Sequence, residues 1–339
     1  MKTGKILVFC ALIYSLTAVS VYAQIGSEIQ DLQDSVDTFS KRMAKVLPFN
    51  STIGLNWSDA YIGQLMDVPP RFGIGFSAGV TFVDINIINE LLDEFDGGKI
   101  NSSMGLPLPG YTIDVRIGGF ALPIPFDVGI KIGLLDTTDW DFMPIGIEYL
   151  LFGLDFRYLL LDSESSPVKI SVGLGFNHLR GGISTNINAG QKLDFLDDDT
   201  GIGYSITFND PSIGLSWQSN VVEFKAHASL PLSVLTPYMG AGLSLGWSRV
   251  GYIIKADMEF EELGLPTDLD DTIKELLGAM GISNISTNGF DSMVNVFDWN
   301  MRLYWGFSIN IVVVKFDFTA MYSLRDAGFG ATLGLRFQL

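Results

Sequence analysis

The sequence predicts an all-β protein: an antiparallel up-and-down transmembrane β-barrel of about 10–14 strands, preceded by an amphipathic helix. Three observations lead to this fold class. Apolar and polar residues alternate in many segments, the chain begins with an export-type segment, and 47% of its 339 residues are hydrophobic. After residue 23, however, no apolar run is long enough for a membrane helix. Such hydropathy is expected when the apolar residues occupy alternate positions of membrane-crossing strands.

The last predicted strand, 329–339, shows the alternation most clearly. Side chains of a strand point alternately to its two faces, so one face is entirely apolar and the other is small or polar. A β-sandwich, which buries such a face against a second sheet, is the alternative fold. The apolar face holds Phe329, Ala331, Leu333, Leu335, Phe337 and Leu339.

Residues 1–23 are predicted to be a secretory signal peptide. Lys2 and Lys5 precede an apolar core, and Val21-Tyr22-Ala23 resembles a cleavage site. The only cysteine, Cys10, lies in this segment, so the remaining chain offers no disulfide or thiolate. The formal charge of −17 argues against nucleic-acid binding.

Residues 24–48 are predicted to form an amphipathic helix that ends at Pro48. Its apolar residues follow a narrow heptad seam, which must be buried against something. Two interpretations remain open: a plug in or beneath the barrel that restricts passage, or a periplasmic coiled coil that makes an oligomer. The seam consists of Ile25, Ile29, Leu32, Val36, Phe39, Met43 and Val46.

Residues 49–339 are predicted to form the barrel. An extra hairpin, 202–208 and 213–219, surrounds residues 209–212, and a change of phase near 150–152 predicts a β-bulge. Loop helices are expected at 86–95 and 267–280. The ten clearest strands are 72–82, 111–121, 126–134, 145–160, 168–177, 222–230, 239–256, 297–311, 314–324 and 329–339.

The connections between these strands alternate in length. Short ones lie near 122–125, 162–167, 231–236, 312–313 and 325–327; long ones lie at 84–110, 136–144, 179–201 and 257–296. Short turns on one side and long loops on the other are typical of outer-membrane barrels.

In this respect residues 72–339 resemble bacterial outer-membrane β-barrel proteins. The last strand resembles their C-terminal assembly signal, through Phe329, Leu333, Leu335, Phe337 and Leu339, but it ends in leucine rather than an aromatic residue. The resemblance implies a place in the cell outer membrane, with outer-membrane lipid and the barrel-assembly machinery as partners. A weaker similarity, to barrels that import fatty acids and aromatic compounds, lacks their Asn-Pro-Ala signature.

If the apolar faces point to lipid, the charged residues of the strands point into the lumen. They form either a salt-bridged constriction or the ordinary polar lining of a wet barrel. Glycines and serines, such as those at 240–248, leave volume for water, the helix or a ligand. The predicted lumen network comprises Asp114, Arg116, Asp127, Lys131, Asp155, Arg157, Lys169, Glu223, Lys225, Asp298, Arg302, Lys315, Asp317 and Arg336, and Glu148 is expected to point inward as well.

No catalytic, cofactor or metal site is predicted. The two histidines, His178 and His227, lack the Asp-x-His pair of outer-membrane proteases and a serine partner. The sequence therefore predicts an outer-membrane channel or transporter for small molecules, with a hydrophobic ligand preferred. The alternative is a non-transporting structural or surface-interaction barrel.

Overall fold

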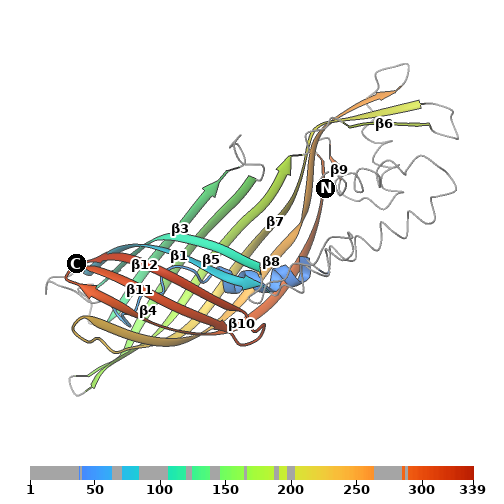
Figure 1. The fold of residues 1–339 in the computed structure, drawn as a ribbon. Coiled ribbons are helices and arrows are strands. Elements are labelled where there is room, and N and C mark those ends of the chain that lie inside the picture. The colour runs from blue at the N-terminus through green and yellow to red at the C-terminus, as the bar shows by residue number, and fades with distance from the viewer. Residues whose placement is uncertain are drawn as a thin grey trace.

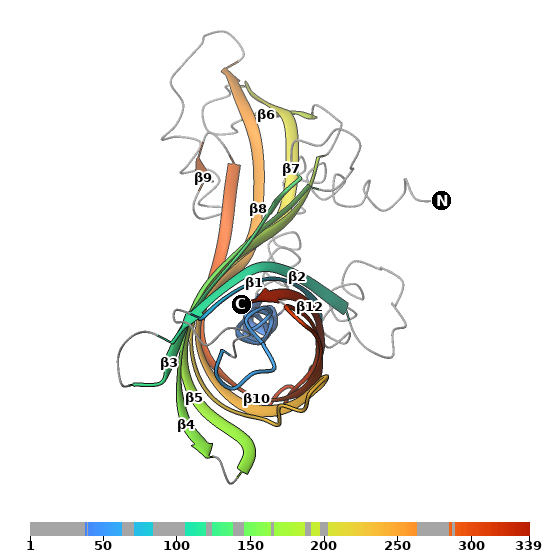
Figure 2. The same cartoon turned by 90° about the vertical axis from the view of Figure 1, so that its left-hand side faces the viewer.

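The computed structural model forms a closed antiparallel barrel whose wall consists of ten strands. In Figure 2, viewed along the barrel, a short helix lies inside the ring of strands. The structure describes residues 38, 40–62, 71–83, 106–119, 124–137, 146–163, 166–186, 191–196, 203–262, 285–286 and 289–339.

The wall runs in chain order around the ring and closes where β12 meets β1. The helix spans 40–50, and two short strands, β6 (Gln191–Leu196) and β9 (Ile285–Ser286), pair outside the ring with β7 and β10. The ring consists of β1 (Arg71–Val83), β2 (Leu106–Gly118), β3 (Phe126–Asp136), β4 (Gly146–Ser163), β5 (Ser166–Asn186), β7 (Gly203–Ser229), β8 (Leu235–Glu262), β10 (Gly289–Ile311), β11 (Val314–Ser323) and β12 (Phe329–Gln338).

The closure confirms the predicted fold class. The last strand pairs with the first from Gly73↔Gln338 to Thr81↔Gly330, and β10 pairs with β11 on the other side of the ring. All strands of the described residues belong to one continuous sheet that closes on itself, so the sandwich alternative is wrong.

The two faces of the wall separate as the alternation predicts. Outward side chains are apolar and exposed, as at Phe76 (49% exposed), Leu243 (39%) and Leu333 (64%). Inward neighbours such as Ser77 and Thr332 are buried. Apolar surface of this extent requires lipid around it, since a soluble monomer rarely exposes such a patch. The described residues contain no helix long and apolar enough to cross a membrane.

The wall is much taller on one side than on the other. Strands β7 and β8 have 27 and 28 residues, whereas β11 and β12 have 10 each. A membrane crossing needs only about 9–11 residues per strand. Strands β7, β8 and β10 therefore continue beyond the ring as a tall sheet (Figure 1). They do so at the end carrying the connections 84–105 and 263–288, here named the long-loop end; the opposite end is the short-turn end.

The predicted hairpin at 202–219 is wrong. Residues 203–229 form one strand, β7, with a register shift between Asn209 and Ser212. Asp210 and Pro211 lie in this irregularity, and proline has no N–H to donate to a ladder. The turn-like sequence thus interrupts the pairing of a long strand without reversing its direction.

The predicted bulge near 150–152 is also wrong. Inward and outward residues keep alternating from Tyr149 to Leu159, and the register shifts of β4 lie between Leu159 and Ser163. The sequence suggested a phase change because the inner face itself becomes apolar at Tyr149 and Leu151. Glu148 consequently lies on the face opposite to Tyr149, not on the lumen face as predicted.

The tight connection between β11 and β12 lies at the long-loop end, not among the short turns where its length placed it. With Gln338 beside Gly73 at the short-turn end, the final hairpin must turn at the other end. The signal peptide and the expected loop helices at 86–95 and 267–280 lie outside the described residues.

Candidate functional site in the barrel lumen

Within the part of the chain that the structure describes, one segment, residues 43–62, fills the lumen; it is called the plug. Every one of its residues except Lys45 is buried. The plug begins as a helix near the long-loop end and continues as an irregular chain to Ile62, whose N–H donates to Asp127 near the short-turn end (2.9 Å). The lumen segment is thus longer than the predicted helix, and it continues past Pro48.

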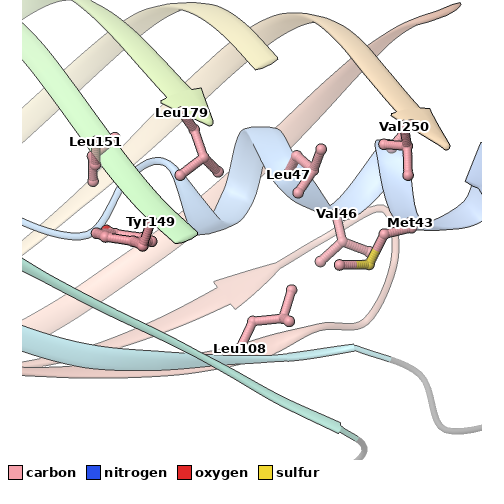
Figure 3. Packing of buried hydrophobic residues seen from close by; sticks show 9 residues of the cluster. Met43, Val46, Leu47, Leu108, Tyr149, Leu151, Leu179 and Val250 are labelled. Atoms are coloured by element: carbon pink, nitrogen blue, oxygen red, sulfur yellow. The ribbon is translucent and has the colours of Figure 1, made fainter. Parts of the chain in front are cut away.

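The helical part of the plug packs into an apolar section of the wall. Met43, Val46 and Leu47 contact inward side chains of β2, β4, β5 and β8 (Figure 3). Met43 and Val46 are the two described members of the predicted seam; Ile25, Ile29, Leu32, Val36 and Phe39 lie outside the described residues. The wall residues of this cluster are Leu108, Tyr149, Leu151, Leu179 and Val250.

Lys131 binds the plug backbone just beyond the helix. Its ammonium group donates to the carbonyls of Ser51 (2.8 Å) and Ile53 (2.6 Å). Both carbonyls lie just after the helix, and the ammonium group supplies the hydrogen-bond partner that a buried backbone carbonyl needs. One turn farther on, the N–H of Leu55 donates to the Asp114 carboxylate (3.0 Å). The wall therefore supplies a cation and an anion to satisfy the plug backbone.

Trp57 fills the middle of the lumen between two arginines. The Arg336 guanidinium lies 4.8 Å from the centre of its ring and that of Arg116 lies 5.6 Å away, both within range of cation–π attraction. The wall makes room for this indole at Gly73, where an added Cβ would lie 2.8 Å from it. The small wall residues noted in the sequence thus accommodate the plug.

Below Trp57, five charged residues from four strands form one buried ion-pair network. Arg116 pairs with Asp127 and Asp155, Arg157 pairs with Asp127 (2.8 Å), and Lys225 pairs with Asp155 (2.6 Å). Each carboxylate is shared by two cations, which compensates charges that would be costly to bury singly.

A second network includes a plug residue. Asp59 pairs with Lys315 (2.8 Å) and Arg336 (3.0 Å), and Arg336 also pairs with Asp317 (2.7 Å). Asp59 is therefore an ionic link between plug and wall, and removing it would leave buried cations undercompensated.

Further wall residues bind the plug by hydrogen bonds. Arg302, paired with Glu223 (2.8 Å), also donates to the Asn56 side chain (3.4 Å). The Nε2 atom of His227 lies 2.9 Å from the carbonyl oxygen of Ser58. His227 thus has a structural contact in the lumen, whereas His178 is bonded to Asn220 on the outer face.

Two predicted members lie apart from these networks. Asp298 pairs with Arg325 in the β11–β12 connection at the long-loop end. Lys169 pairs with Asp162 at the short-turn end (3.0 Å), where both side chains are more than a third exposed. The assembly-signal residues Phe329, Leu333, Leu335, Phe337 and Leu339 are all exposed on the outer face.

Sequence reasoning missed the plug residues after Pro48, including Asn56, Ser58 and Asp59. The available signal was negative: residues 49–62 have neither the period of a strand nor that of a helix, although they are rich in Asn, Ser and Thr. Among the described residues, no group of His, Cys, Asp or Glu is placed to hold a metal ion.

Above the plug, the inner face of the tall sheet is apolar. Leu215, Trp217 and Val296 pack against the helix cluster but remain only half-buried. The charged part of the inner wall lies toward the short-turn end, so the lumen has an apolar mouth and a polar, filled interior.

The wall has a seam beside this mouth, between β2 and β3. Their pairing ends at Ile113↔Ile132, although both strands continue toward the long-loop end. The Tyr111 ring lies at this seam, 6.4 Å from the ring of Phe76 on the outer face and 5.5 Å from the ring of Tyr149 on the inner face. Aromatic side chains thus connect the lipid-facing and lumen-facing sides of the wall.

No family model and no curated protein matches this chain. Among solved structures, it is similar to the attachment invasion locus protein Ail of Yersinia pestis (10% identity, 80% of this chain and 97% of that one, TM-score 0.28). It is also similar to the toluene transporter TbuX of Ralstonia pickettii (12%, 81% and 90%, 0.25) and the translocator domain of the autotransporter NalP of Neisseria meningitidis (9%, 95% and 99%, 0.30). At these TM-scores, no functional property is transferred from them.

The architecture itself places the protein. A closed antiparallel barrel has no open sheet edge, and an apolar outer belt is suited to contact with lipid. The chain is an outer-membrane β-barrel protein.

Proposed function

We propose that the protein is a plugged outer-membrane transport barrel for small, apolar molecules. The observation that carries this proposal is the change of polarity along the inner wall. The mouth presents Leu215, Trp217 and Val296, whereas the interior presents charges bound to the plug. The mouth offers apolar contact to a ligand, and the charged interior retains a polypeptide.

The filled lumen is incompatible with free diffusion through the barrel. Every plug residue but Lys45 is buried, and Asp59 and Ile62 are bonded to the wall. Transport therefore requires either a movement of the plug or a route that avoids it. Polar contacts suit a movable plug, because water can replace them when the plug shifts.

The seam between β2 and β3 offers the second route. A ligand in the mouth would reach the outer face by displacing Tyr111, which lies between Tyr149 and Phe76. An aromatic route of this kind suits an apolar ligand, which gains no hydrogen bonds from the charged interior.

The test is the uptake of a fluorescent apolar probe, N-phenylnaphthylamine, by intact cells that express the protein. Val296→Asp places a charge on the inner face of the mouth, and Asn295→Asp places the same charge one residue away on the outer face. We expect uptake above that of cells without the protein, a loss of this gain with Val296→Asp, and little change with Asn295→Asp. Uptake equal to that of cells without the protein would contradict transport.

The second candidate is a surface-interaction barrel that transports nothing. The tall sheet favours it, because β7 and β8 have 27 and 28 residues, whereas a strand needs only about 9–11 to cross a membrane, so both strands project beyond the ring. Absence of uptake together with unchanged conductance after removal of residues 24–62 would favour this candidate.

A further inference from the structure

On the side of the barrel formed by β4, β5, β7, β8 and β10, the outer face changes from apolar to polar within one row of residues. The strand register places Phe152, His178, Asn220, Trp247 and Phe297 in one row across β4, β5, β7, β8 and β10. The next row toward the long-loop end contains Leu150, Arg180, Gln218, Arg249 and Asn295. The second row therefore lies just above the apolar belt.

The aromatic residues mark the boundary of the membrane. The rings of Trp247 and Phe297 are 5.3 Å apart and both side chains are more than half exposed on the outer face. Aromatic girdles of barrels lie at the level of the lipid headgroups. Arg180 and Arg249, one row higher, are therefore at headgroup level or immediately above it.

A hollow of about 440 Å³ opens in the wall at this height. Its floor is made of small residues on β5 and β7, because Gly182, Ser184, Gly214 and Ser216 leave the backbone uncovered. Arg180, Gln218 and Arg249 line it toward the membrane, and Glu148 also lines it. The hollow thus combines two cations with one carboxylate.

Among the described residues, the two arginines, Arg180 and Arg249, have no ion-pair partner within bonding distance, although the chain as a whole carries a formal charge of −17. Each is exposed and is separated from the other by Gln218, at about 10 Å between the outer strands. Side chains of this length can converge on one anion or bind two neighbouring ones.

We propose that this hollow binds the headgroup of a phosphorylated glycolipid in the outward-facing leaflet. Arginine binds phosphate through two parallel hydrogen bonds, and Arg180 and Arg249 would provide them at the height where the phosphates of such a lipid lie. Glu148 would accept hydrogen bonds from sugar hydroxyls, and the acyl chains would lie along the exposed rings of Phe152 and Trp247.

The test is native mass spectrometry of the full-length protein in detergent with bis-phosphorylated lipid A. We expect the double variant Arg180→Gln/Arg249→Gln to retain about one tenth as much of this lipid as the unmodified protein, or less, because charged hydrogen bonds to phosphate are lost. Dephosphorylated lipid A should be retained weakly by both proteins. Glu148→Gln removes the nearby negative charge and should raise retention about twofold.

Lys169→Gln is the matched control, since it removes an exposed cation at the short-turn end. Equal losses in the control and the double variant would indicate a general charge effect and would overturn the proposal. Retention by the double variant at the level of the unmodified protein would also overturn it. Displacement of the lipid by millimolar inorganic phosphate would indicate a site for soluble anions instead.

Discussion

The lower and upper parts of the sheet use their two faces in opposite ways. In the membrane, the outer face is apolar and the inner face carries buried charges such as Asp127 and Arg157. Above the membrane, the outer face carries Arg180 and Arg249, and the inner face carries Trp217 and other apolar residues. Along one continuous sheet, the polar face therefore changes from the inner to the outer side, while the side chains keep alternating between the two faces.

This inversion shows what determines each face. Lipid requires an apolar outer face only over the height of the membrane, and the lumen can be charged there because the plug and paired charges satisfy it. Above the membrane, water surrounds the outer face, and the inner face is free to become apolar.

Breaking a buried ionic link should cost far more than breaking an exposed one. Asp59→Ala leaves Arg336 and Lys315 undercompensated in the lumen and should lower the free energy of unfolding by about 3–5 kcal/mol. Asp162→Ala removes an exposed pair with Lys169 and should cost about 0–0.5 kcal/mol. Denaturant titrations in lipid vesicles measure both, and equal costs would mean that the plug is not ionically bound.

A new charge on the outer face should be costly only at the height of the membrane. Leu333→Arg should destabilise the barrel by about 2–4 kcal/mol if Leu333 lies near the membrane midplane. Asn295→Arg, on the outer face above the belt, should cost about 0–0.5 kcal/mol. Refolding titrations into vesicles measure the difference, and similar costs would contradict the boundary at Trp247 and Phe297.

Thr332 and Asn300 point into the lumen, where an added charge would be expected to cost little. Neither position is nevertheless suitable as a mild control for Leu333→Arg. Both are buried, and the Asn300 amide donates to Ser323 (2.7 Å) and Asp326 (3.0 Å). An arginine at either position would meet packed neighbours instead of water.

The helical part of the plug should depend on its apolar contacts. Leu47→Ala creates a cavity in a cluster where Leu47 is 1% exposed and should cost about 2–3 kcal/mol. Lys45→Ala, on the exposed side of the same helix, should change stability by less than about 0.5 kcal/mol. Protease sensitivity of the plug in the folded barrel reports the difference, and equal sensitivity would show that the cluster does not hold the helix.

The smallest effect is expected where the wall makes room for the plug. Gly73→Ala brings a Cβ to 2.8 Å from the Trp57 indole and should cost about 1–2 kcal/mol. In a Trp57→Ala background the same substitution should be nearly neutral. A double-mutant cycle of unfolding free energies gives this coupling directly, and strict additivity would exclude the contact.

The sequence was sufficient for the barrel but not for the height of its wall. Lipid forces the alternation seen at 329–339, so the fold class followed from the pattern. Above the membrane this constraint disappears, and for this reason the sequence predicts loops at 179–186 and 289–296, which are strands. The same loss of constraint explains why Glu148 was wrongly predicted to face the lumen.

The candidate site was predictable in part. Inward charges such as Arg116 and Asp155 followed from their strand positions, but their partners depend on the stagger of neighbouring strands, which alternation does not encode. Asp59 was missed because residues 49–62 take their conformation from hydrogen bonds to the wall rather than from a local period.

A reversible tether between plug and wall tests most directly whether the plug gates transport. A Cβ at Gly246 would lie 3.2 Å from the Cβ of Pro48, close to the ~3.5–4.5 Å of a disulfide, and the chain has no cysteine besides Cys10. For Pro48→Cys/Gly246→Cys, N-phenylnaphthylamine uptake should be low when the tether is oxidised and should return when it is reduced. Equal uptake in the two states, with the disulfide shown to be complete, would contradict a moving plug.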